Sequence, residues 1–302
     1  MGAPRPAIGI TVGDPAGIGP EIARKTAADP RVLDVCTPVL YGPPADRSFS
    51  IGRVSADAGR AAYDAIVAAV DDARAGRIAG VATAPINKEA FAAAAIPWRG
   101  HTELLAHLTG AQRVAMMFHS AALRVVLATV HIPLVEVPHA LTRESLEATI
   151  ALTASELPRF GWPSPRLALA GLNPHAGEHG LMGLEDDAVL RPAVEASQSR
   201  GIAIEGPLPA DTVFVRAMRG EFDAVIACYH DQGLIPVKLV AFGEAVNVTL
   251  GLPIIRTSVD HGTAFDIAGK GVADPSSMIQ AVLLAARLAV GKAGTPSRAV
   301  AE

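Results

Sequence analysis

The sequence lacks several features that would place it in common functional classes. Its 26 Lys and Arg residues stand against 30 Asp and Glu residues, a net charge of -4. Such a balance shows no basic excess and argues against nucleic acid as the main partner. No uninterrupted run of about 18 apolar residues occurs, so we expect no membrane span. The first residues also lack the apolar region of a signal peptide, and we expect a cytoplasmic protein.

Cysteine and familiar cofactor motifs are scarce as well. Cys36 and Cys228 are the only cysteines and form no CxxC pair, which excludes a disulfide framework and favours a reducing compartment. The glycine-rich stretch 13–20 is not a GxGxxG motif, because Ile22 stands where the third glycine belongs, and it is not a phosphate loop ending in GK[ST]. It fits either an anion-binding turn or a plain tight turn between strand and helix.

What the sequence does contain is an alternation of apolar strands and amphipathic helices. Half of its 302 residues are apolar, so a large core is expected. The pattern predicts strands over 7–12, 38–41, 78–83, 114–118, 123–129, 167–172 and 224–227, helices over 56–75, 141–157, 186–198 and 276–290, and a turn over 206–212. Such alternation predicts an α/β fold with a mostly parallel sheet.

Three histidines share one position relative to the predicted strands. His131, His175 and His230 each follow a strand within a few residues. If these strands are parallel neighbours, their ends lie at one edge, and the imidazoles could meet around zinc or another divalent metal. The spacing is too wide for a local metal motif, and a single loop histidine is more often not a ligand, so both interpretations stay open.

A second group of polar residues suits an anion. Lys238, Asn247 and Arg256 follow at nine-residue intervals among apolar residues that look like strands and turns. Earlier in the chain, Thr102 is a candidate N-cap that would leave His101 exposed at the positive end of a helix. That helix end either holds an anion or is simply capped.

Several ordered motifs resemble the 4-hydroxythreonine-4-phosphate dehydrogenase family along nearly the whole chain. They are GDPAGIGPEI, TAPINK, GHTE, HIPL, LNPHAGE, PADTVF, YHDQGLIPVK, VNVTLGLP and RTSVDHGTAFDIAGKG. The last of these also resembles a loop of isopropylmalate and isocitrate dehydrogenases. The resemblance implies two α/β domains around a cleft, the first over 1–110 and 240–302 and the second over 111–239.

The resemblance also implies roles for individual residues. His131, His175 and His230 would bind one divalent ion (zinc, magnesium, cobalt or manganese). The phosphorylated substrate would be held by His101, Thr102, Lys238, Asn247 and Arg256, with Lys238 also catalytic. His261, Gly262 and Asp266 would bind NAD, and a carboxylate at Asp266 would disfavour a 2′-phosphate. The site would be shared between the subunits of a homodimer. We further infer that Asp211 and Asp231 orient the metal-binding imidazoles.

The implied reaction is the NAD- and metal-dependent oxidation and decarboxylation of 4-phosphooxy-L-threonine to 3-amino-2-oxopropyl phosphate, a step in pyridoxal phosphate synthesis. A related branch of the family acts on 4-phospho-D-threonate or 4-phospho-D-erythronate, and the sequence does not separate the two. A metal-dependent phosphatase built on the three histidines is an alternative of another class. The chain departs from the family in its short segment between Tyr41 and Val54, and in His179, for which we have no account.

Overall fold

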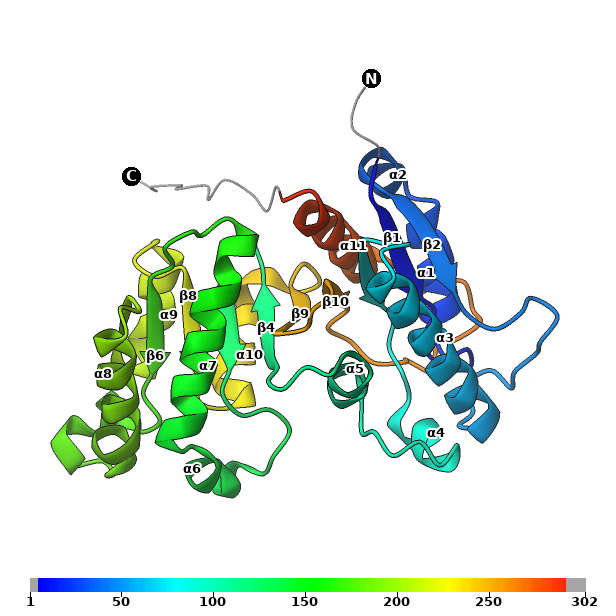
Figure 1. The fold of residues 1–302 in the computed structure, drawn as a ribbon. Helices are drawn as coiled ribbons and strands as arrows, with labels where there is room; N and C mark the ends of the chain where they lie inside the picture. Colours follow the sequence, from blue (N-terminus) through cyan, green and yellow to red (C-terminus); the bar gives the residue numbers. More distant parts are fainter. Residues whose placement is uncertain (1–4, 292–302) are drawn as a thin grey trace. The chain divides into compact units, whose positions relative to one another are not determined.

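The computed structural model describes residues 5–291, which form two compact units. The first unit runs up to Val114 and resumes at Val246, and the second unit is Ala115–Ala245. Figure 1 shows the helices and strands of both. Among the described residues, no helix has both the length and the apolar character needed to cross a membrane.

The first unit is a five-stranded sheet with helices on both faces. Its strands, in spatial order, are β2 (Thr37–Tyr41), β1 (Ala7–Thr11), β3 (Gly80–Thr83), β10 (Arg256–Ser258) and β9 (Val246–Leu250). All neighbours are parallel except β10 and β9. Its helices are α1 (Gly19–Ala27), α2 (Pro30–Val35), α3 (Ala56–Arg74), α4 (Lys88–Ala93), α5 (His101–Thr109) and α11 (Ser276–Ala289).

Burial explains the strands of this first unit. Strands β1 and β3 contact both α3 and α11, so they are covered on two faces and consist almost wholly of buried residues. A strand covered on both faces is apolar throughout and does not alternate. Edge strand β2 is partly exposed, and Figure 1 shows it at the margin of the unit.

The second unit is also a five-stranded sheet. Its strands run in the order β4 (Ala115–His119), β5 (Arg124–Leu127), β8 (Ala224–Ala227), β6 (Leu167–Ala170) and β7 (Ile204–Leu208), and only β4 and β5 are antiparallel. Its α-helices are α6 (Val137–Ala140), α7 (Arg143–Glu156), α8 (Arg191–Ser199), α9 (Ala210–Met218) and α10 (His230–Ala241). Shorter helical turns are η1 (Leu134–Glu136), η2 (Leu157–Phe160), η3 (Pro174–Gly180) and the π-helix η4 (Asp186–Leu190).

Local sequence fixes the start of α7. Thr142 Oγ1 accepts a hydrogen bond from Ser145 N, and Ser145 Oγ accepts one from Thr142 N, which is a reciprocal capping pair. The turn predicted over 206–212 is wrong, because these residues belong largely to β7 and α9. Pro207 is tolerated in β7 because β7 lies at the edge of the sheet.

Candidate active site

The three predicted histidines all lie at the carboxyl edge of the second unit's sheet. His131 follows β5, His175 follows β6, and His230 is the first residue of α10, directly after β8. Strands β5, β8 and β6 are parallel neighbours, so their carboxyl ends share one edge. Open α/β sheets place ligands at this edge.

Two of the three imidazoles come together there. The ring centroids of His131 and His230 are 5.4 Å apart, with 43° between the ring planes. Because imidazole nitrogens bind divalent metals at about 2.0–2.1 Å, this separation suits two rings that share one ion. Asp231 Oδ1 lies 2.7 Å from His230 Nδ1. A carboxylate only accepts hydrogen bonds, so Nδ1 is the donor in this contact, and in the neutral tautomer Nε2 has a lone pair for a ligand.

His175 does not join this pair within one chain. Over residues 5–291, no three His, Cys, Asp or Glu side chains gather closely enough to hold a metal ion. His175 is exposed on η3, where five consecutive residues from His175 to His179 have φ between 42° and 79°. This left-handed turn costs about 1–2 kcal/mol for each residue other than glycine.

One buried and one half-buried polar side chain tie the three strand ends to one another. Thr129 Oγ1 donates to Cys228 O at 2.7 Å, which joins the chain before His131 to the chain before His230. Gln232 Oε1 accepts from Cys228 N at 2.6 Å, and Gln232 Nε2 donates to Gly171 O at 2.7 Å. Sequence reasoning missed both residues, although each lies within a few positions of a buried strand end.

Cys228 itself plays no nucleophilic part. Burial, and secondly the nearby Asp186 carboxylate, raise the pKa of its thiol far above the ordinary value. The sulfur donates to Ala170 O at 3.3 Å, so Cys228 is a buried structural thiol.

The structure places Lys238 and Asp211 on helices of the second unit. Lys238 is on helix α10 and not in a strand or turn, and its exposed ammonium lies 5.9 Å from the centre of the Phe242 ring. Asp211 is exposed in the first turn of α9. At this position its negative charge interacts favourably with the positive end of the helix dipole.

In the first unit, Arg256 is a buried cation with no acidic partner among the described residues. Only 3% of the residue is exposed. Its guanidinium donates to Thr83 Oγ1 through Nε at 3.2 Å and Nη2 at 2.8 Å, and to Thr249 Oγ1 through Nη1 at 2.9 Å. Burial lowers the pKa of Arg256 to about 9, which still leaves it charged at neutral pH. A buried charge held only by hydroxyls is suited to an anionic ligand.

His101 lies in the electrostatic field of Arg256. Burial, and secondly the charge of Arg256, lower the pKa of His101 well below its usual value, so the ring is neutral. Its Nε2 and the Oδ1 atom of Asn247 are buried polar atoms without a hydrogen-bond partner in the described structure. The expectation that Thr102 caps this helix is wrong, because Gly100 is the N-cap and His101 and Thr102 form the first turn of α5.

The loop that carries His261, Gly262 and Asp266, the residues predicted to bind NAD, packs against the glycine-rich turn at 13–20. Thr263 O accepts a hydrogen bond from Ile18 N at 3.0 Å, and a Cβ added to Gly17 would lie 2.8 Å from Thr263 O. The turn's amides from Asp14 to Ile18 bond internally or to neighbouring loops, so this stretch is a tight strand-to-helix turn. His261, Gly262 and Asp266 themselves are exposed.

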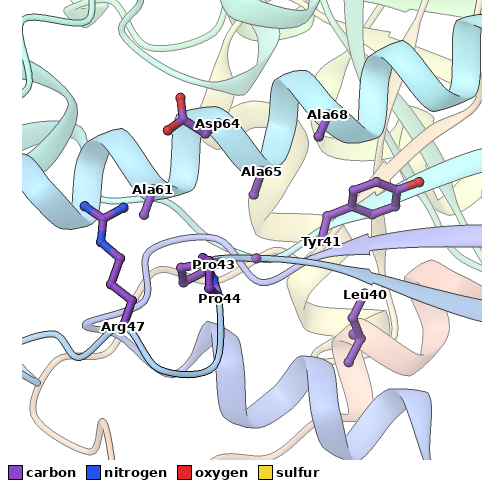
Figure 2. Close-up of a pocket in the computed structure, with 10 residues that line it drawn as sticks. Leu40, Tyr41, Pro43, Pro44, Arg47, Ala61, Asp64, Ala65 and Ala68 are labelled. Carbon is purple, nitrogen blue, oxygen red and sulfur yellow. The ribbon is translucent and has the colours of Figure 1, made fainter.

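A pocket of about 250 Å³ lies away from the predicted residues. Figure 2 shows Tyr41, Pro43, Pro44 and Arg47 facing the alanine-rich side of α3. It lies between the end of β2, the segment that follows it, and α3, and Tyr41, the last residue of β2, donates from Oη to Asp72 Oδ2 at 2.5 Å. No residue expected to bind substrate, metal or cofactor lines it.

Comparison with known proteins identifies relatives over nearly the whole chain. The family model described as pyridoxal phosphate biosynthetic protein PdxA matches residues 18–285. The chain is 46% identical to a 4-hydroxythreonine-4-phosphate dehydrogenase of Desulforapulum autotrophicum, over 93% of this chain and 95% of the relative. It is 43% identical to a D-threonate 4-phosphate dehydrogenase of Cupriavidus necator, over 95% of this chain and 98% of that relative. The first alignment spans 323 positions, more than this chain's 302 residues, so that relative has segments that this chain lacks.

Solved structures agree with the predicted fold. A 4-hydroxythreonine-4-phosphate dehydrogenase from Klebsiella pneumoniae superposes with a TM-score of 0.86 at 40% identity, covering 94% of this chain and 99% of the other. An isocitrate dehydrogenase from Methylococcus capsulatus gives a TM-score of 0.50 at 18% identity, covering 95% and 86%. The latter likeness concerns the fold alone, and the expected α/β class related to isocitrate dehydrogenase is confirmed.

Proposed function

We propose, from the premise that this chain belongs to the PdxA family of pyridoxal phosphate biosynthetic proteins, that it oxidises a phosphorylated 3-hydroxy acid with NAD and a divalent metal ion. The substrate we propose is 4-phosphooxy-L-threonine, which loses carbon dioxide to give 3-amino-2-oxopropyl phosphate. The observation that carries the proposal is the pairing of His131 and His230 beside Asp231 at the carboxyl edge of the sheet.

The metal would be held by His131 and His230 of one subunit together with His175, which we assign to the partner subunit. Their donor set of neutral imidazoles fits zinc, cobalt, manganese or, with more water ligands, magnesium. When bound, such an ion supplies Lewis-acid polarisation of the substrate hydroxyl. Asp231 keeps the His230 ring in the tautomer that presents Nε2.

Sharing of the site requires a homodimer, and the apolar surface of the second unit supports one. Leu239 and Phe242 are each 80% exposed near the end of α10, Val135 is 72% exposed on η1, and Leu181 is 75% exposed after η3. These exposed side chains flank the three histidine loops in the sequence. Apolar patches of this kind mark protein interfaces, and a two-fold dimer is the simplest closed assembly.

The substrate's anionic groups would be bound by the residues that carry positive charge or unsatisfied polar atoms. In the first unit these are Arg256, whose guanidinium lacks an acidic partner, and His101 and Asn247, each with a polar atom that lacks a hydrogen bond. Thr102, beside His101 in the first turn of α5, would add a hydroxyl. In the second unit it is Lys238, which we also propose to be catalytic and whose ammonium is exposed. Such contacts fix the orientation of the substrate for hydride transfer.

NAD would contact His261, Gly262 and Asp266, with the Asp266 carboxylate accepting from ribose hydroxyls. The exposed carboxylate is free of hydrogen bonds within the described chain, which leaves it available. NAD, when bound, supplies the hydride acceptor, and the protein's part is position and charge. We propose a cytoplasmic location, where this cofactor is abundant.

A second substrate class is favoured by a specific observation. The relative from Cupriavidus necator, a D-threonate 4-phosphate dehydrogenase, is 43% identical to the chain, close to the 46% of the relative named for hydroxythreonine phosphate. We therefore keep 4-phospho-D-threonate and 4-phospho-D-erythronate as alternatives. They carry the same phosphate and carboxylate and differ in bearing a hydroxyl where the first substrate has its amino group.

The test is NADH formation by the purified protein with each of the three substrates and a supplied divalent metal. Absorbance at the NADH band reports oxidation, and a parallel assay for inorganic phosphate reports hydrolysis. We expect NADH to accumulate with one of the three and no phosphate to be released. Phosphate release without NAD would instead support a metal-dependent phosphatase and would reject the proposal.

A further inference from the structure

A buried acidic residue lies under the turn that carries His175. Asp186, the first residue of η4, is fully buried and forms no ion pair with a Lys, Arg or His in the described chain. Its carboxylate instead accepts three N–H groups. Oδ1 accepts from Leu172 N at 2.9 Å, and Oδ2 accepts from Asn173 N and from Asn173 Nδ2, each at 3.0 Å.

The three donors all come from the two residues that begin the His175 loop. Asn173 is the N-cap of η3, and the left-handed stretch begins two residues later, at His175. The adjoining Glu185 reinforces the contact, because its Oε2 accepts from Asn173 Nδ2 at 2.8 Å. The amide of Asn173 is thus shared between two neighbouring carboxylates, while Asp186 also holds the backbone.

Two glycines let the turn close onto Asp186. A Cβ added to Gly171 would lie 2.9 Å from Ala176 Cα and 3.0 Å from Asp186 Oδ1. A Cβ added to Gly177, inside the turn, would lie 3.1 Å from Asp186 Cβ. The backbone of the turn therefore lies so close to Asp186 that any side chain larger than that of glycine would be crowded at these two positions.

A left-handed run with four residues other than glycine persists only where its surroundings fix it. A buried carboxylate without a cation is retained only where several donors satisfy it. The buried carboxylate and the strained turn stabilise each other. The N–H groups that satisfy Asp186 belong to the loop that carries the turn, so the same hydrogen bonds also fix that loop. Stability alone would be served by an uncharged residue and a relaxed loop.

We propose that Asp186 is a positioning residue that holds the left-handed turn in the conformation presenting His175 to the metal. The inference rests on the proposed function, in that His175 must be a metal ligand. The substitution Asp186→Asn would turn an N–H₂ group toward one of the three donors, and one hydrogen bond would be replaced by a repulsive contact.

The test uses the purified full chain and Co²⁺ as the probe, since its visible absorption reports ligand number and geometry. We expect Asp186→Asn to raise the Kd for Co²⁺ by about 10–100-fold and to alter the absorption bands. Activity should return when Co²⁺ is raised in proportion. The matched control is Asp187→Asn, which removes the same charge one residue further along, where Asp187 pairs with Arg191 at 2.8 Å. It should leave the Co²⁺ Kd unchanged.

Each outcome separates the inference from the function on which it rests. If His175→Ala leaves Co²⁺ binding intact, the proposed metal site is wrong. If His175→Ala weakens binding while folded Asp186→Asn binds Co²⁺ as the wild type does, the positioning role alone is wrong, even if the melting temperature falls. Should Asp186→Asn not fold, Asn173→Ala serves as the second variant, because it removes only the side-chain donor to Asp186. It should also raise the Kd for Co²⁺, by a smaller factor than is expected for Asp186→Asn. An unchanged Kd in that variant contradicts the inference.

Discussion

The imidazole rings of His131 and His230 lie 5.4 Å apart between centroids, although they follow different strands of the sheet. Nothing in the local sequence of either residue requires this meeting. It arises because β5 and β8 are adjacent and parallel, so both chains leave the sheet at one edge. The proposed metal site depends on this pair.

The first prediction concerns the carboxylate beside the pair. Asp231→Asn should weaken metal binding by about 10–100-fold, because the amide no longer fixes the His230 Nδ1–H tautomer. Isothermal titration with Zn²⁺ measures the change. His139→Ala is the control, since this exposed histidine on α6 is not part of the pair. Equal affinity in wild type and Asp231→Asn would contradict the orienting role.

The second prediction separates stability from substrate binding at Arg256. Arg256→Met should lower kcat/KM by about 10–150-fold, the equivalent of one charge-assisted hydrogen bond of about 1.5–3 kcal/mol. The free energy of unfolding, measured with urea, should stay the same or rise, because the variant no longer buries a charge without an acidic partner. A loss of more than about 3 kcal/mol would mean that Arg256 is chiefly structural.

The third prediction is a pH dependence set by His101. Its folded pKa is lowered, first by burial and then by Arg256, so the unfolded chain binds a proton that the folded protein does not. As pH falls below the ordinary histidine pKa of about 6.5, the unfolded chain gains this proton and the free energy of unfolding decreases. Above that pH the histidine is neutral in both states and lowers the free energy of unfolding no further. His101→Gln should therefore show a shallower loss of unfolding free energy between about pH 6.5 and 5. An identical slope in both proteins would reject this cause.

The fourth prediction tests the apolar surface of α10. Leu239→Glu should shift the protein from dimer to monomer in sedimentation experiments, because the side chain is 80% exposed in the single chain and would be buried against a partner. Leu33→Glu, on α2 with 43% exposure, is the control and should stay dimeric. A fully dimeric Leu239→Glu protein would place the interface elsewhere.

Buried strands and capped helices could be predicted from the sequence. The all-apolar runs of β6 and β8 and the helix predicted over 141–157 are local signals, and the structure confirms them. Strand β7 escaped prediction because Gly206 and Pro207 are typical of turns, and only its place at the sheet edge makes them acceptable.

The candidate site was less visible in the sequence. Matching positions after strands indicated the three histidines, but not the left-handed turn around His175, since Ala176 and Glu178 have no preference for that conformation. The lowered pKa of His101 was also missed, because its two causes, burial of the ring and the charge of Arg256, are tertiary effects. The roles of Asp186 and Gln232 depend on contacts between segments that sequence spacing does not reveal.

The most direct test of the shared metal site is subunit complementation. His175→Ala and His230→Ala proteins should each be inactive in NADH formation. Mixed in equal amounts and allowed to exchange subunits, they should recover about a quarter of wild-type activity, because half of the dimers are hybrids with one intact site of two. If all three histidines acted within one subunit, every site in the hybrid would lack a ligand, and the mixture would stay inactive.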